Sequence, residues 1–177
     1  MLLPSIRPHG RAIALCPKNC ADRLFYQISL ASIGNSLQTY STLHFTRRVY
    51  NGLFVRNTKL PGPRAGYNPE DSTSKLLAVP QKDSKGTDQV TPLAGRLFGT
   101  WTLMVCIVRL YAAYNLQIGP VYDMAMWTFV IALCHFSSEL FVFKSMTFGL
   151  PQLGPFVVAT IGLIWMPTAR SFYVQSA

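Results

Sequence analysis

Charged side chains are scarce in this chain of 177 residues, with seven Asp and Glu against sixteen Lys and Arg. Soluble domains average about 25% charged residues, whereas this sequence has 13%. Between residues 100 and 168 the only charged side chains are Arg109, Asp123, Glu139 and Lys144. The net charge of +9 alone would suit a nucleic-acid-binding protein. The apolar second half instead favours a membrane protein whose basic loops face anionic lipid, and we expect no nucleic-acid partner.

Catalytic signatures are missing as well. The sequence contains no Gly-rich phosphate loop, no nucleophile elbow, no histidine-box set and no dinucleotide fingerprint. Cys16 and Cys20 lie four residues apart, but no second Cys or His pair stands at zinc spacing. We therefore expect no metal, no cofactor and no enzymatic activity.

Long apolar runs are the main feature that the sequence does have. A spanning helix needs about 20 mostly apolar residues. Three runs meet this requirement, and Gly119 and Pro120 separate the first two, so that these form an antiparallel hairpin. The expected spans are 97–116, 121–143 and 150–167.

A fourth candidate span, 24–45, is more polar than the others because it carries Gln27, Asn35 and Gln38. Small and amide side chains are typical of helix interfaces inside membranes. Hydropathy alone leaves two interpretations open, a membrane span and a soluble amphipathic helix.

These segments predict an all-α integral membrane protein, a bundle of four transmembrane helices with a long disordered loop between helices 1 and 2. We expect a disordered tail over 1–22 and a four-helix membrane domain over 23–170. The solvated loop should cover 53–92, which is rich in Pro, Gly, Ser, Lys and Asp and has no sustained period.

The orientation follows from the basic residues. The side that holds the long loop has about twice the Lys and Arg of the other side, so the positive-inside rule places it in the cytosol. We expect Arg47, Arg48 and Arg96 at the level of the cytosolic headgroups.

Ionisable residues inside a span are expensive, at about 2.5–3.5 kcal/mol for Arg or Asp at mid-bilayer. Counting residues outward from the hairpin turn gives Arg96 and Glu139 similar depths, which predicts an ion pair between them at the cytosolic boundary. A weaker Arg109–Asp123 pair is expected near the other boundary, since an Arg side chain can reach toward it. Each residue could instead extend unpaired to the headgroups.

Two short patterns are also notable. His135 and Glu139 stand at i and i+4 and therefore share a helix face; they could bind a metal, pass a proton, or face the helix bundle in a structural role. Gly95 and Gly99 form a G-x-x-x-G pattern that permits close approach of another helix, within the chain or from a partner.

Four segments, in order along the chain, resemble the ergosterol biosynthetic protein 28 family of small endoplasmic reticulum membrane proteins. They are "NSLQTYSTLHFTRRVYNG" (35–52), "LFGTWTLMVCIVRLYAAYN" (97–115), "ALCHFSSELFVFKS" (132–145) and "GPFVVATIGLIWM" (154–166). The resemblance covers most of 24–166 and favours a span at 24–45. The family joins its first two spans by a shorter loop, so most of 53–89 is extra here, as an insertion or a translated intron.

The resemblance implies a multi-pass, non-catalytic scaffold of the endoplasmic reticulum membrane. It would tether a sterol C-4 methyl oxidase, a sterol-4-carboxylate decarboxylating dehydrogenase and a 3-keto sterol reductase. Polar and small residues on one face of the bundle are the candidates for docking: Asn35, Gln38, Gly99, Trp101, Arg109, His135 and Glu139. The alternative is a sterol-binding or sterol-isomerising membrane enzyme that uses His135 and Glu139 as acid and base.

Overall fold

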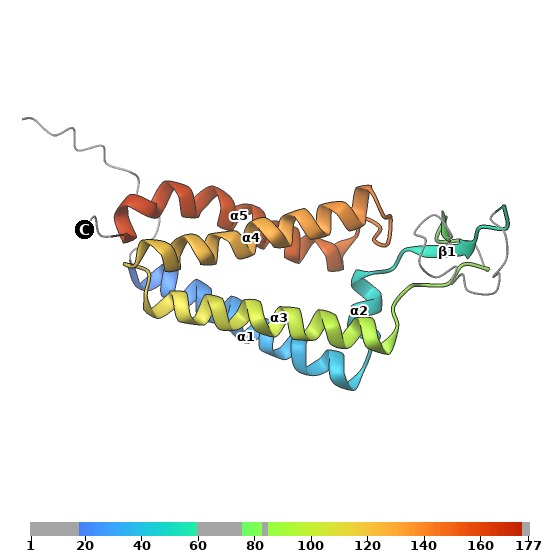
Figure 1. Cartoon of the computed structure of the whole chain (residues 1–177), viewed down its shortest axis with the longest axis horizontal. Helices are drawn as coiled ribbons and strands as arrows, with labels where there is room; N and C mark the ends of the chain where they lie inside the picture. The colour runs from blue at the N-terminus through green and yellow to red at the C-terminus, as the bar shows by residue number, and fades with distance from the viewer. Residues whose placement is uncertain (1–17, 60–75, 83–84, 175–177) are drawn as a thin grey trace, which may run out of the picture.

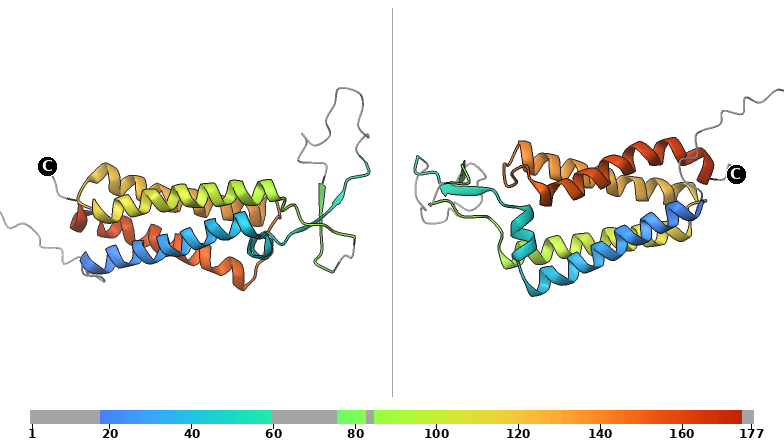
Figure 2. Two further views of the ribbon diagram at one scale, coloured as in Figure 1. Left: turned by 90° about the horizontal axis from the view of Figure 1, so that it is seen from below. Right: turned by 180° about the vertical axis from the view of Figure 1, so that it is seen from behind.

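Two pairs of antiparallel helices form the body of the computed structural model, which describes residues 18–59, 76–82 and 85–174. Helix α1 (Lys18–Ser41) packs along α3 (Pro92–Tyr114), and α4 (Gly119–Phe141) packs along α5 (Leu150–Tyr173). Figures 1 and 2 show that the α3–α4 turn and the end of α5 lie at one end of the bundle. The short helix α2 (His44–Val49) and the α4–α5 connection lie at the other end.

Helices α3, α4 and α5 are each long and apolar enough to cross a membrane, so the chain is a multi-pass membrane protein. Their starts follow from local sequence. The Thr91 side chain caps α3 by accepting a hydrogen bond from the Ala94 N–H at 3.1 Å, and a proline occupies the first turn of all three helices, where its missing N–H costs nothing. Large apolar side chains on the outer faces of these helices remain exposed, as contact with lipid requires: Leu103, Met104, Ile107, Tyr111, Trp127, Ile161 and Ile164.

Helix α1 buries small polar side chains and exposes leucines, unlike a soluble amphipathic helix. Its buried face carries the small polar residues Ser29, Ser36 and Thr39, while Leu30 and Leu37 are exposed. The Ser36 and Thr39 hydroxyls donate to backbone carbonyls of their own helix. Gly99 of α3 faces this surface, and a Cβ on Gly99 would collide with the Thr39 hydroxyl. The G-x-x-x-G pattern therefore serves packing within the chain.

The core has two parts. One cluster joins all four long helices near the α3–α4 turn and includes Phe25, Ala112, Tyr122, Phe129 and Met166. Within it, the Tyr122 hydroxyl donates to the Met166 carbonyl at 2.7 Å and links α4 to α5. A second, smaller cluster lies toward α2 and is centred on Ala132, Phe136, Met146 and Ala159.

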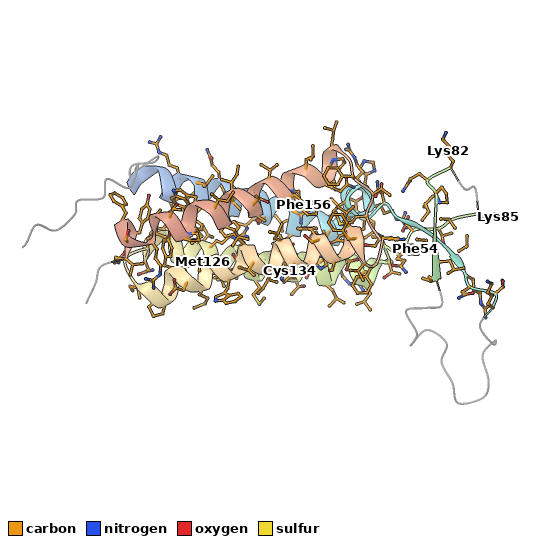
Figure 3. The ribbon with its side chains drawn as sticks, turned by 90° about the horizontal axis from the view of Figure 1, so that it is seen from above. Phe54, Lys82, Lys85, Met126, Cys134 and Phe156 are labelled. Atoms are coloured by element: carbon orange, nitrogen blue, oxygen red, sulfur yellow. The ribbon has the colours of Figure 1, made fainter. Side chains whose placement is uncertain are left out.

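The expectation of a long loop without regular structure over 53–92 was wrong in part. Strands β1 (Leu53–Arg56) and β2 (Leu76–Val79) pair antiparallel, with Phe54 opposite Ala78, and the backbone of Phe54 also bonds to Thr87. Figure 3 shows Lys82 and Lys85 near these strands, beyond the end of the helices. Each strand has only four residues, too few for a period to stand out in the sequence.

Two boundaries also differ from the expected ones. Helix α1 begins at Lys18, inside the segment expected to be a tail; residues 1–17 and 60–75 lie outside the described part of the chain. Helix α5 continues past the expected end at 167 to Tyr173, and this extra length moves Arg170 into the helix.

Candidate functional site

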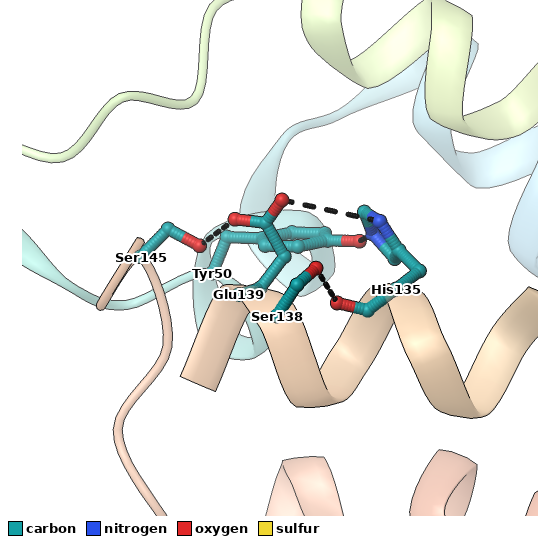
Figure 4. Close-up of polar contacts among 5 residues, drawn as sticks. All are labelled: Tyr50, His135, Ser138, Glu139 and Ser145. Carbon is teal, nitrogen blue, oxygen red and sulfur yellow. Dashed lines mark hydrogen bonds and ion pairs between the residues drawn. The ribbon is translucent and has the colours of Figure 1, made fainter. Parts of the chain in front are cut away.

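Polar side chains from three segments meet at the α2 end of the bundle (Figure 4). The Tyr50 hydroxyl lies 2.7 Å from Nε2 of His135. Nδ1 of His135 is 3.9 Å from a carboxylate oxygen of Glu139. The Ser145 hydroxyl donates to the other carboxylate oxygen of Glu139 at 2.5 Å. We call Tyr50, His135, Glu139 and Ser145 the polar cluster.

The elements around the polar cluster hold Tyr50 in place. Gln152 of α5 donates to the carbonyls of Arg48 and Val49 at 2.8 and 2.9 Å, which fixes the end of α2. Asn51 accepts hydrogen bonds from the backbone and hydroxyl of Thr147 at 2.8 and 3.0 Å. The α2–β1 junction is therefore tied directly to the α4–α5 connection.

Gly52 extends this junction. Its N–H donates to the Ser145 carbonyl at 2.8 Å, and a side chain at this position would collide with the backbone of Lys144 and Ser145. The close approach of the two backbones explains why glycine is needed here. It also places Ser145 beside Glu139.

The electrostatics of the polar cluster favour a neutral Tyr50. Burial, and secondly the charge of Glu139, hold the pKa of the Tyr50 hydroxyl far above its usual range near 10. A neutral hydroxyl can donate to Nε2 of His135, and the proton on Nδ1 then points toward Glu139. This arrangement pairs the Tyr50 hydroxyl with Nε2 of His135 and leaves the Nδ1 proton facing Glu139 at 3.9 Å. It would let the polar cluster hold a polar ligand group or relay a proton.

The polar cluster borders a cavity of about 500 Å³, which we call the larger cavity. This volume falls within the range of small-molecule sites, about 300–1,000 Å³. Most of the wall is apolar, and the Trp101 ring lies 5.4 Å from the His135 ring. The lining residues besides the polar cluster include Leu97, Phe98, Trp101 and Ile131.

A second cavity of about 270 Å³ lies between the two helix pairs, with walls from α1, α3, α4 and α5. We call it the smaller cavity. Phe98 and Trp101 line both cavities, so the two are neighbours. Asn35 and Arg109 are the most polar residues in the wall of the smaller cavity.

The predicted Arg109–Asp123 pair was wrong. Asp123 is bound by Arg170 through two hydrogen bonds of 2.8 Å. Arg109 donates to the Thr128 hydroxyl at 3.0 Å, and its guanidinium carbon lies 4.1 Å from the centre of the Phe129 ring. The prediction failed because α5 was expected to end before Arg170.

The predicted Arg96–Glu139 pair was also wrong, since Glu139 interacts with Ser145 and His135 and Arg96 is exposed. The two residues were matched by depth in the membrane. Depth fixes height along a helix but not the direction in which a side chain points, and here Glu139 points toward the α4–α5 connection (Figure 4).

The structure brings the predicted site residues together only in part. His135, Glu139 and Trp101 line the larger cavity, and Asn35, Arg109 and Trp101 line the smaller one. Gln38 donates to Asn35 at 3.1 Å, whereas Gly99 is buried against α1. The three basic residues expected near the headgroups are all exposed: Arg47, Arg48 and Arg96. The Arg47 Nε atom also lies 3.4 Å from a carboxylate oxygen of Asp88.

Sequence reasoning missed Tyr50 and Ser145 as site residues. Tyr50 directly follows the segment that contains Arg47 and Arg48, but no motif around it indicated a site residue. Its contact with His135 spans 85 positions, and no local pattern predicts such a contact.

The fold and the site define a helical, multi-pass membrane protein with polar side chains gathered at one end of an apolar cavity. The family model described as "Erg28 like protein" matches residues 23–164, and the chain belongs to this family. The family takes part in ergosterol biosynthesis, as the resemblance predicted.

Named relatives agree with this membership. The chain is 66% identical to "Ergosterol biosynthetic protein 28" of Gibberella zeae over 148 residues, which cover 84% of this chain and 86% of the relative. It is 32% identical to the Saccharomyces cerevisiae protein of the same name over 93% of this chain and 90% of that one. A mouse homolog is 38% identical over 44% of this chain and 55% of its own length. No solved structure matches the chain.

Proposed function

We propose that the chain is a non-catalytic scaffold of the endoplasmic reticulum membrane. It tethers a sterol C-4 methyl oxidase, a sterol-4-carboxylate decarboxylating dehydrogenase and a 3-keto sterol reductase. The observation that carries the proposal is family membership across residues 23–164, in a pathway whose intermediates dissolve poorly in water. Tethered enzymes act at a raised effective concentration, so a membrane protein without a catalytic signature can still promote the pathway.

The bundle contains four spans in this proposal, with α1 as the fourth. Its small polar residues face α3 and its leucines face outward, which is how helices pack in lipid. Four crossings place the start of α1 and the end of α5 on one side of the membrane. The basic α2 end, with Arg47, Arg48 and Arg96 at the headgroups, faces the cytosol.

Docking surfaces follow from what remains accessible. Asn35, Gln38, Trp101, His135 and Glu139 are each partly exposed, and all but Gln38 line one of the two cavities. Gly99 and Arg109 act from inside, because Gly99 sets the α1–α3 approach and Arg109 lines the smaller cavity. Partner helices would dock on this face through small and amide side chains.

One capture experiment tests the scaffold. The tagged chain is purified from membranes in mild detergent, and the three enzymes are quantified in the eluate. Trp101→Ala, in the cavity wall, should reduce their recovery. Trp127→Ala, on the lipid-facing side of α4, is the matched control and should not. Recovery of none of the enzymes with the wild-type chain would refute the proposal.

A second candidate, a sterol-isomerising enzyme, is favoured by one observation: His135 and Glu139 lie 3.9 Å apart in the wall of a cavity of about 500 Å³. An isomerase needs an acid and a base beside the substrate. Turnover of a sterol by the isolated chain, abolished by Glu139→Gln, would establish this candidate over the scaffold.

A further inference from the structure

The Arg109 guanidinium has no carboxylate partner among the described residues, although only 6% of this residue is exposed. Its Nε–H donates to the Thr128 hydroxyl, and the Phe129 ring lies against its carbon. A guanidinium has five N–H donors, and within the described part of the chain no acceptor bonds to its terminal nitrogens. Asp123 is the acidic residue of α4 that stands nearest to Arg109 in the sequence, and it forms an ion pair with Arg170.

A buried cation is costly in a helix bundle inside a membrane unless a charge or several hydrogen bonds compensate it. A ring face contributes on the order of 1–2 kcal/mol, and one neutral hydroxyl contributes less than an anion does. The protein alone therefore leaves Arg109 incompletely compensated. The missing group is an acceptor, and a carboxylate fits best because it pairs with a guanidinium through two parallel hydrogen bonds.

The surroundings define the rest of the ligand. Arg109 lines the smaller cavity, whose other walls are mostly apolar: Ile28, Val105, Phe129, Phe136 and Val158. Phe98 and Trp101 separate this space from the larger cavity, and both rings line both cavities. A ligand that fills this region has an apolar body and carries its acidic group on the Arg109 side.

We infer that the two neighbouring cavities together bind a sterol carboxylic acid, with its carboxylate on Arg109 in the smaller cavity and its ring system against Phe98 and Trp101. The identity of the body as a sterol rests on the proposed function, whereas the acidic group follows from Arg109 alone. The scaffold would then hold an acidic intermediate between the enzymes that it tethers.

The direct test measures ligand binding to the purified chain in lipid nanodiscs. Quenching of Trp fluorescence is the readout, because Trp101 lies in the wall of both cavities. The probes are a 4-carboxylated sterol, the matching 3-hydroxysterol without the carboxyl group, and a long-chain fatty acid. The acid should bind at least about tenfold more tightly than the alcohol, as expected for hydrogen bonds to a charged group. Equal affinity for the acid and the alcohol would overturn the inference, and equal affinity for the fatty acid would overturn the sterol body.

Three variants locate the site. Arg109→Met should remove the preference for the acid, and Arg23→Met, at an exposed arginine of α1, should leave it intact. Gly154 borders the smaller cavity and has open space where a Cβ would stand, so Gly154→Phe should weaken binding of the acid while Arg109 remains. If Arg109→Met does not fold, acid binding by Gly154→Phe still tests whether the ligand occupies the smaller cavity. Unchanged acid binding in either folded variant would refute the site.

The enzyme-capture experiment separates this inference from the proposed function. Loss of acid binding in Gly154→Phe with normal recovery of the enzymes supports the cavity and leaves the scaffold intact. Selective acid binding by a wild-type chain that captures no enzyme would refute the scaffold but retain the acid site.

Discussion

The hydroxyl of Tyr50 and the imidazole of His135 meet at 2.7 Å across 85 positions of sequence. This contact links the end of α2 to the second half of α4, and it orders the wall of the larger cavity on both sides. Glu139 and Ser145 extend the link to the α4–α5 connection. Polar contacts thus connect α2, α4 and the α4–α5 connection at this end of the bundle.

Replacing Tyr50 by Phe should destabilise the protein by about 1 kcal/mol, because it leaves a half-buried imidazole without its partner. The measurement is thermal unfolding in detergent. Tyr111→Phe is the control, since Tyr111 is exposed on α3 and should unfold like the wild type. An unchanged midpoint for Tyr50→Phe would show that the contact does not stabilise the fold.

Alkaline pH should destabilise the wild type through Tyr50. The unfolded tyrosine ionises near pH 10, whereas the folded pKa is raised by burial and by Glu139. Above about pH 10 the unfolded state therefore binds fewer protons than the folded state, and the stability falls as the pH rises. Tyr50→Phe should lose less stability than the wild type between pH 9 and 11, measured by denaturant titration. Identical slopes for the two proteins would contradict this.

Gly99→Ala should destabilise the α1–α3 pair by about 1–3 kcal/mol, the usual cost of overpacking. The added methyl group would collide with the Thr39 hydroxyl, so Thr39→Ala in the same chain should recover part of the loss. Gly34→Ala is the matched control, because its Cβ meets nothing within 4 Å and alanine favours a helix. Unfolding midpoints in detergent test all three, and a neutral Gly99→Ala would refute the close approach.

A double-mutant cycle should find coupling between Asp123 and Arg170 and additivity between Asp123 and Arg109. Both members of the first pair are partly exposed, so the coupling should be small. Asp123→Asn, Arg170→Gln and Arg109→Gln, alone and paired, supply the two cycles. Coupling in the Arg109 cycle alone would support the pair that the sequence suggested and contradict the structure.

The sequence predicts the helices better than it predicts their contacts. The apolar runs bounded by Gly119–Pro120 and Pro151 placed three helices close to where they lie, because length and hydropathy determine which segments lipid accepts. The hydropathy of α1 was ambiguous because the helix carries many polar residues, of which Ser29, Ser36 and Thr39 are buried while Gln27 is exposed. Only the structure reveals which face they occupy.

The site was predictable only where both partners lie on one helix. His135 and Glu139 are four residues apart, so their shared face followed from helix geometry. The partners of Asp123 and Tyr50 depend on how each helix is rotated about its axis and on where α5 ends. Hydropathy determines neither. The two predicted ion pairs failed for this reason.

We propose that this chain brings the sterol C-4 demethylation enzymes together, and co-purification of those enzymes from membranes tests the proposal. In membranes from cells that lack the chain, the decarboxylating dehydrogenase is captured and the co-purifying oxidase and reductase are quantified. If the chain is the tether, their association is lost without it and restored by the wild type, while the turnover of each isolated enzyme is unchanged. Equal association in the presence and absence of the chain would contradict it.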